Sequence, residues 1–380
     1  MHKIIIVYAD GLGFHYFCNQ TIGSAMKNAF QKQIPLSSIL GYSVGILPSI
    51  WTSSYPRDHE NWTIWSLRND YEPRPIRLRS LEWKLTCIGL YGMKRLSSVL
   101  GKYSTISASI PTPIRNNFVN RNIDISKPYK PFDRQSLLSV FDKEGISWRY
   151  KFCWRFEDML ADDVDECDAI VYFAGELDDL GHFQGPTSRK MYLRILDLSR
   201  ILNKLTKETE LLCLFSDHGM YPLRGTVDLL SKLKHLPVTL GLHYLVFLES
   251  TIARFWFFSD KAEEEISSLL SKLSCGHFLS ASEITDYGLS CGDCIFGDKI
   301  YLLNPGIEIF PSFFHPLHRN LYKGMHGYAP RGENSLAVFA ATKNFESNSG
   351  NLVDISPTVL DFLHLGVPKE WRGKSLVGRS

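Results

Sequence analysis

The chain has 380 residues, of which 44% are hydrophobic and 22% charged, and its formal net charge is +2. This composition predicts an ordinary globular core, and the length predicts one large α/β domain with an inserted subdomain, or two domains. A net charge so close to zero argues against nucleic acid, beyond nucleotides, as a partner of the whole protein. The sequence leaves the oligomeric state open.

The sequence predicts a cytoplasmic protein with reduced thiols. The apolar run after Lys3 is too short for the apolar region of a signal peptide, and no apolar stretch is long enough to span a bilayer. The eight cysteines are scattered, apart from Cys291 and Cys294, and without a signal peptide we expect free thiols. A zinc knuckle at Cys291 and Cys294 is the less favoured interpretation, because no second pair at matching spacing follows.

Three apolar runs predict buried strands, and each is followed by side chains that could bind a metal ion. Open α/β sheets place their ligands at the carboxyl ends of parallel strands. Each match alone is short, and an isolated carboxylate after a strand is more often a helix cap. The runs and the residues that follow them are 3–8 with Asp10, 169–173 with Asp178 and His182, and 211–215 with Asp217 and His218.

Ser43 and His326 add a hydroxyl and an imidazole to this set. Ser43 follows a glycine and a tyrosine and precedes an apolar run, which predicts a hydroxyl at the amino end of a helix, where N–H groups favour an anion. A serine in a turn is usually only a cap, so this feature too depends on its company. His326 begins a His-Gly-Tyr segment ahead of a strand predicted over residues 336–341.

The chain is predicted to contain a core formed by residues 1–235 and 322–380. Between these two parts, residues 236–321 show a β-α-β pattern that predicts a small inserted α+β cap subdomain. A second insertion, basic and aromatic, is predicted within the core at about residues 57–135.

The second insertion is strongly basic. Between Arg74 and Arg115 there are eight Lys or Arg and one acid, Glu82, so this segment carries +7 and the rest of the protein −5. Residues 81–100 have the pattern of a basic amphipathic helix. It could be a solvated helix lying on the core, a lid over an anionic substrate, or a contact of residues 74–115 with an acidic membrane surface.

Oxygen and imidazole ligands without thiolates suit divalent ions, with zinc the first candidate and manganese the second. The set is large enough for two ions with three protein ligands each. Two such ions polarise the attacking and leaving oxygens of a phosphoryl transfer, and a serine hydroxyl bound to a dication becomes a competent nucleophile.

In this order and spacing, the motifs resemble the alkaline phosphatase superfamily, most closely its type I phosphodiesterase and nucleotide pyrophosphatase branch. The resemblance covers about residues 1–60, 165–225 and 322–380, and implies an α/β core with a mostly parallel sheet between helices. The motifs are Asp10 in Tyr-Ala-Asp-Gly-Leu-Gly, Ser43 nine residues before Thr52-Ser-Ser-Tyr-Pro-Arg-Asp-His59, Asp178-x-x-x-His182 before Gly185-Pro186, Asp217-His218-Gly219-Met220, His326-Gly327-Tyr328, and the tail from Asp354 to Leu376.

The resemblance implies a role for each matched residue. Asp10, Ser43, Asp217 and His218 would surround one ion, and Asp178, His182 and His326 would hold the other. Ser43 would attack phosphorus to give a phosphoseryl intermediate, and His59 would be structural.

The leading hypothesis is therefore a metal-dependent phosphodiesterase acting on a small anionic phosphate ester or pyrophosphate. Lys323, His315 and His318 are candidates for contact with the substrate, and the favoured alternative for the two histidines is that they are ordinary loop histidines. The apolar Ile46, three residues after Ser43, offers no hydrogen bond to a phosphoryl oxygen and leaves the choice between diester and monoester open. The alternatives are a phosphomonoesterase with the same ions, a metal-retaining binding module, and a membrane-surface adaptor.

Overall fold

The computed structural model describes residues 4–78, 110–121, 134–160, 167–290, 295–314 and 321–378. In these residues, no helix combines the length and the apolar character needed to cross a membrane. Five features discussed above lie outside the described residues: the helix predicted over residues 81–100, Cys291, Cys294, His315 and His318.

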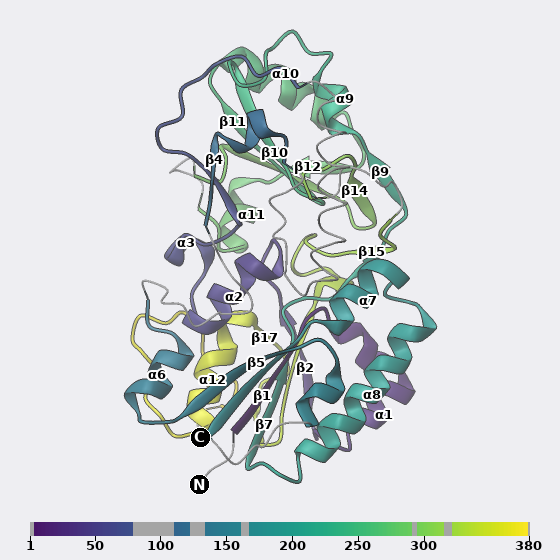
Figure 1. Cartoon of the computed structure of the whole chain (residues 1–380), viewed down its shortest axis with the longest axis vertical. Coiled ribbons are helices and arrows are strands. Elements are labelled where there is room, and N and C mark those ends of the chain that lie inside the picture. Colours follow the sequence, from purple (N-terminus) through teal and green to yellow (C-terminus); the bar gives the residue numbers. More distant parts are fainter. Residues whose placement is uncertain are drawn as a thin grey trace.

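A mixed seven-stranded sheet forms the core (Figure 1). In spatial order its strands are β17 (Gly350–Asn351), β2 (Gln33–Ser37), β16 (Ala337–Ala341), β7 (Leu211–Phe215), β1 (Ile4–Ala9), β6 (Ala169–Ala174) and β5 (Trp148–Cys153). Neighbours are parallel from β7 to β5, whereas β16 is antiparallel to both β2 and β7. The predicted mostly parallel α/β core is therefore confirmed, with one reversed strand.

Helices cover both faces of this sheet (Figure 1). One face packs against α2 (Ser43–Thr52), α6 (Leu137–Lys143) and α12 (Ile355–Phe362), and the other against α1 (Gln20–Met26), α7 (Glu176–Gln184) and α8 (Arg189–Leu205). This two-sided cover explains the unbroken apolar runs, because alternate side chains of one strand enter opposite halves of the core. In β1, Ile6 and Tyr8 face one cluster, and Ile5 and Val7 face the other.

A second, four-stranded antiparallel sheet lies beyond the carboxyl ends of the core strands (Figure 1). Its order is β10 (Tyr244–Leu248), β11 (Ile252–Phe257), β13 (Lys299–Leu303) and β12 (Gly276–Phe278), and it is accompanied by α9 (Leu229–Leu233), α10 (Asp260–Ser271) and α11 (Ala281–Asp286). An antiparallel pair from the basic insertion, β3 (Trp65–Leu67) and β4 (Phe118–Asn120), shares its hydrophobic cluster. Trp65 and Phe118 both pack against Phe247 of this sheet.

The remaining described elements are short. They are η1 (Phe14–Cys18), α3 (Pro56–His59), α5 (Thr112–Arg115), η3 (Phe156–Leu160), β8 (Tyr221–Pro222), β9 (Gly225–Val227), β14 (Ile307–Ile309), β15 (Gly324–Met325), η5 (Glu333–Ser335) and η6 (Leu352–Asp354). Strand β15 pairs with β8, and β14 pairs with β9, so segments far apart in the sequence meet between the sheets.

His59, at the end of α3, is held in its neutral form by two hydrogen bonds. The backbone N–H of Asn61 donates to Nδ1 at 3.1 Å, which leaves Nε2–H to donate to Ser49 Oγ at 2.8 Å. Burial, with a contribution from the charge of Arg134, lowers the pKa of His59 to about 4. A proton on Nδ1 would face the Asn61 N–H, so charging the ring breaks this arrangement.

His59 should therefore make the protein less stable in acid. Because the histidine titrates near pH 6.5 when unfolded and near 4 when folded, the unfolded chain binds more protons between these values. Stability is then complete above about pH 6.5 and falls by about 2 kcal/mol between pH 7 and pH 5. Urea unfolding of the wild type and His59→Gln at both pH values measures this loss. An equal loss in the two proteins would assign it to other groups.

Candidate active site

Seven predicted site residues meet at the carboxyl end of the central sheet. Because β1, β6 and β7 are parallel and in register, the segments that follow them emerge side by side. Figure 1 shows α2 and α7 on either side of this edge, between the two sheets. Asp10 follows β1, Asp178 and His182 lie on α7 after β6, Asp217 and His218 follow β7, Ser43 is the first residue of α2, and His326 follows β15.

Asp10, Asp217 and His218 form one cluster whose ligand atoms all lie within 4.8 Å of one another. His218 Nε2 is 3.4 Å from Asp10 Oδ1 and 3.3 Å from Asp217 Oδ2. The Ser43 hydroxyl joins this cluster, with Oγ 3.2 Å from Asp10 Oδ1 and 3.1 Å from His218 Nε2. His218 Nδ1 donates to the carbonyl oxygen of Gly219 at 3.0 Å, so the lone pair of Nε2 faces the cluster.

Asp178, His218 and His326 form a second cluster, also within 4.8 Å. His326 Nε2 is 3.6 Å from Asp178 Oδ1, and the rings of His218 and His326 stack at 3.7 Å. His182 approaches the same oxygen of Asp178 at 3.4 Å, while its Nδ1 donates to Gly324 O at 2.9 Å. The resemblance separates His218 from Asp178 and His326, whereas the structure makes His218 common to both clusters.

The charges of this region fit divalent cations. Asp10, Asp217, His218 and His326 are all buried, and burial together with Asp217 and Asp178 raises the pKa of Asp10 well above its usual range. Burial also raises the pKa of Asp178, but the facing imidazoles outweigh it and hold that pKa well below the usual range. Within the described residues, the buried oxygens Asp178 Oδ1 and Asp217 Oδ2 accept no hydrogen bond of ordinary geometry. Buried carboxylate oxygens facing imidazole nitrogens are suitable ligands for metal ions, so the two clusters could hold them.

His326 and His182 differ in basicity because their charged neighbours differ. Burial, and then the neighbouring His218, lowers the pKa of His326 well below its usual value. Burial acts the same way on His182, but the carboxylate of Asp178 outweighs it and leaves the pKa of His182 raised. A neutral imidazole is the form that binds a metal ion, so His326 is ready to act as a ligand.

The structure places two residues whose bearing on the substrate stays a prediction, Ile46 and Lys323. The side chain of Ile46 is 1% exposed and packs in the core cluster with Trp51 and Phe215, so it offers no hydrogen bond to a ligand. On a helix that begins at Ser43, the third residue along faces the sheet and not the site. Lys323 contributes a backbone N–H, which donates to His182 O at 2.6 Å, while its side chain is exposed.

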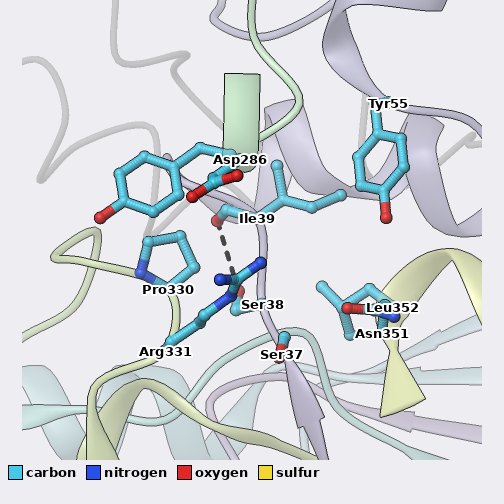
Figure 2. A pocket seen from close by; sticks show the side chains of 10 residues that line it. Ser37, Ser38, Ile39, Tyr55, Asp286, Pro330, Arg331, Asn351 and Leu352 are labelled. Atoms are coloured by element: carbon cyan, nitrogen blue, oxygen red, sulfur yellow. Dashed lines mark hydrogen bonds between the residues drawn. The ribbon is translucent and has the colours of Figure 1, made fainter. Parts of the chain in front are cut away.

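The sequence did not predict that the hydroxyl group of Ser38 supports the site. Ser38 Oγ donates to the backbone oxygen of Asp217 at 2.6 Å, and the two residues are 179 positions apart, so no local pattern predicts the contact. Beside Ser38 lies a cavity of about 30 Å³, lined also by Tyr55, Asp286 and Arg331 (Figure 2). Asp286 and Tyr287 line it from one side and residues 37–39 and 351–352 from the other, so it lies where segments far apart in the sequence meet.

Among comparisons with known proteins, the one with solved structures identifies the fold. No family model matches the sequence, and no curated protein matches it. Human ectonucleotide pyrophosphatase/phosphodiesterase 5 is similar in structure with a TM-score of 0.66 and 15% identity, over 98% of this chain and 97% of that chain. An inactive form of the murine protein in complex with AMP gives 0.65 and 16%, over 97% and 96%. The chain has the fold of the ectonucleotide pyrophosphatase/phosphodiesterases, as the resemblance to the alkaline phosphatase superfamily implies.

Proposed function

We propose that this protein is a metal-dependent phosphodiesterase that hydrolyses a small anionic phosphodiester or pyrophosphate. The observation that carries the proposal is the Ser43 hydroxyl, which lies at the start of α2 within 3.2 Å of both Asp10 and His218, beside two adjoining His and Asp clusters. The fold supports the reaction class, and the AMP bound to the murine protein supports a nucleotide-like substrate.

The residues of the chain suit a two-step displacement. Ser43 Oγ forms a bond to phosphorus as the bond to the leaving alcohol or phosphate breaks, and the serine proton goes to the leaving group or to water. The other ester group stays on the phosphoserine until water cleaves its bond to Ser43, which releases the product and regenerates the hydroxyl. The first N–H groups of α2, those of Ser43 and Val44, have no partner within the helix and are available to phosphoryl oxygens. Divalent ions bound at the two clusters, with zinc favoured over manganese, would supply charge neutralisation and lower the pKa of the Ser43 hydroxyl.

The reaction class can be tested with zinc-loaded protein and two chromogenic esters. Bis(4-nitrophenyl) phosphate should be cleaved faster than 4-nitrophenyl phosphate, as measured by kcat/KM from nitrophenolate release. A faster monoester would reassign the protein as a phosphomonoesterase with the same site. Two bound zinc ions without turnover of either ester would contradict the enzyme and favour a binding module.

Ser43→Ala should lower kcat by at least about 10³-fold, because the nucleophile is lost. Zinc binding, followed by calorimetry, should persist through the carboxylates and imidazoles. Ser43→Thr is the matched control, since it keeps a hydroxyl at this position and should retain measurable turnover. In the wild type, mass spectrometry of protein quenched in acid during turnover of bis(4-nitrophenyl) phosphate should find a 4-nitrophenylphosphoryl group on Ser43. Near wild-type turnover in Ser43→Ala would sink the mechanism.

Asp178→Asn should weaken the binding of one of two zinc ions by at least about tenfold, because it removes a charge that faces His326 and His182. At a free zinc concentration a hundred times its Kd, that ion adds about 2.7 kcal/mol to the free energy of unfolding. Zinc titration of the unfolding temperature therefore measures the loss. Asp179→Asn, at the adjacent exposed carboxylate, is the control and should change the titration less, because Asp179 acts on His182 only through its charge. Identical titrations for the two variants would remove Asp178 from the site.

A further inference from the structure

The hairpin turn between β10 and β11 is buried, although turns usually lie on the surface. Its residues Glu249, Ser250 and Thr251 are 1%, 4% and 0% exposed. Neighbouring segments hold the turn in place, since Ser250 O accepts from the N–H of Ile309 at 2.7 Å and Thr251 O from that of Leu303 at 3.0 Å. A polar turn buried in this way points to a function for its polar groups at the core.

Thr251 takes part in a directional chain of hydrogen bonds. Its Oγ1 donates to Gly327 O at 2.8 Å, which uses its one proton. Tyr42 Oη lies 2.9 Å from Thr251 Oγ1 and accepts from the Thr251 N–H at 2.9 Å. The Tyr42 hydroxyl must therefore donate to Thr251 Oγ1. Burial, and then the charge of Glu249, raises the pKa of Tyr42, so that the phenol keeps this proton.

The two ends of this chain are the neighbours of site residues. Tyr42 directly precedes Ser43 and caps α2, and Gly327 directly follows His326. The Tyr42 ring also meets the His326 ring edge-on at 5.4 Å. Gly327 has φ +85°, and a Cβ there would lie 2.8 Å from Thr251 Oγ1, so the three segments approach as closely as their backbones allow.

We propose that Thr251 is a positioning residue, contributed by the cap, that sets the placement of the nucleophile Ser43 relative to the ligand His326. The Thr251 hydroxyl bridges the segment that contains Tyr42 and the segment that contains Gly327. If the turn between β10 and β11 moves away, both segments lose this hydrogen bond. Displacement of a reacting group by about 1 Å can lower a rate about a hundredfold, so this junction makes catalysis depend on a seated cap. The proposal rests on the phosphodiesterase function proposed above.

Thr251→Val tests the hydroxyl directly, because valine keeps the shape and the N–H that Tyr42 accepts. In the zinc-loaded protein, kcat on bis(4-nitrophenyl) phosphate should fall about tenfold with KM changed less than about twofold. Binding of one of the two zinc ions should weaken about tenfold by calorimetry, through the freed His326 segment. Thr251→Ser, which keeps the hydroxyl, should stay within about threefold of the wild type in both readouts.

Two further variants separate positioning from a general loss of stability. Thr358→Val removes another fully buried threonine hydroxyl with two hydrogen bonds, on α12 and outside the site, and should change neither kcat nor zinc binding. Tyr42→Phe breaks the same junction from the other side, so the double variant with Thr251→Val should be little worse than either single one.

Three results would overturn the proposal: an unchanged zinc affinity in Thr251→Val, an equal defect in Thr251→Ser, or losses that multiply in the double variant. If the wild type binds two zinc ions but cleaves neither ester, the phosphodiesterase function fails. The zinc titrations of Thr251→Val, Thr251→Ser and Thr358→Val then still decide whether Thr251 positions His326.

Discussion

Three carboxylates, those of Asp10, Asp178 and Asp217, converge at one edge of the central sheet, and the rest of the site is arranged around their mutual repulsion. Two of them are buried, where removal from water disfavours their charged form. The raised pKa of Asp10 and the lowered pKa of Asp178 show that the protein groups neutralise this charge unevenly. A pair of dications would neutralise all three at once, which supports the inference that the two clusters could hold metal ions.

The fold makes this convergence possible because apolar strands bring the carboxylates together. Strands β1, β6 and β7 are buried along their whole length, so their apolar contacts offset the unfavourable burial of charge at their ends. Carbonyl oxygens then orient the imidazoles, as Gly219 does for His218 and Gly324 for His182. The turn between β10 and β11 brings the hydroxyl of Thr251 to Tyr42 and Gly327, the residues next to Ser43 and His326.

The strands of the core could largely be predicted from the sequence, because each buried strand appears as an uninterrupted run of apolar residues. The apolar run 211–215 is a strand with the predicted bounds. A strand covered on both faces carries apolar residues throughout, without the alternation of apolar and polar residues seen in a half-exposed strand. Most residues of the two clusters lie just past a strand or at a helix start, where an apolar run makes them easy to find, whereas His182 lies near the end of α7. The antiparallel direction of β16 could not be predicted, because the apolar pattern of a buried strand is the same in parallel and antiparallel pairing.

The contacts that were missed depend on tertiary structure alone. The position of Ile46 in the core cluster could not be predicted, because its distance from Ser43 along the chain says nothing about which face of α2 meets the sheet. Thr251 and Tyr42 are 209 residues apart, and Ser38 and Asp217 are 179 apart, so each hydrogen bond exists only once the cap and core have folded together. Hydroxyl groups leave no periodic pattern, and their partners are visible only in the structure.

The most direct test of the account is the anomalous diffraction of zinc-loaded crystals at the zinc absorption edge. The account predicts two peaks about 3.5–4 Å apart, one against Asp10, Asp217 and His218 and the other against Asp178 and His326. A single peak, or peaks elsewhere on the chain, would contradict a two-metal centre. Peaks in both clusters with Ser43 beside one of them would establish the arrangement on which the proposed hydrolysis depends.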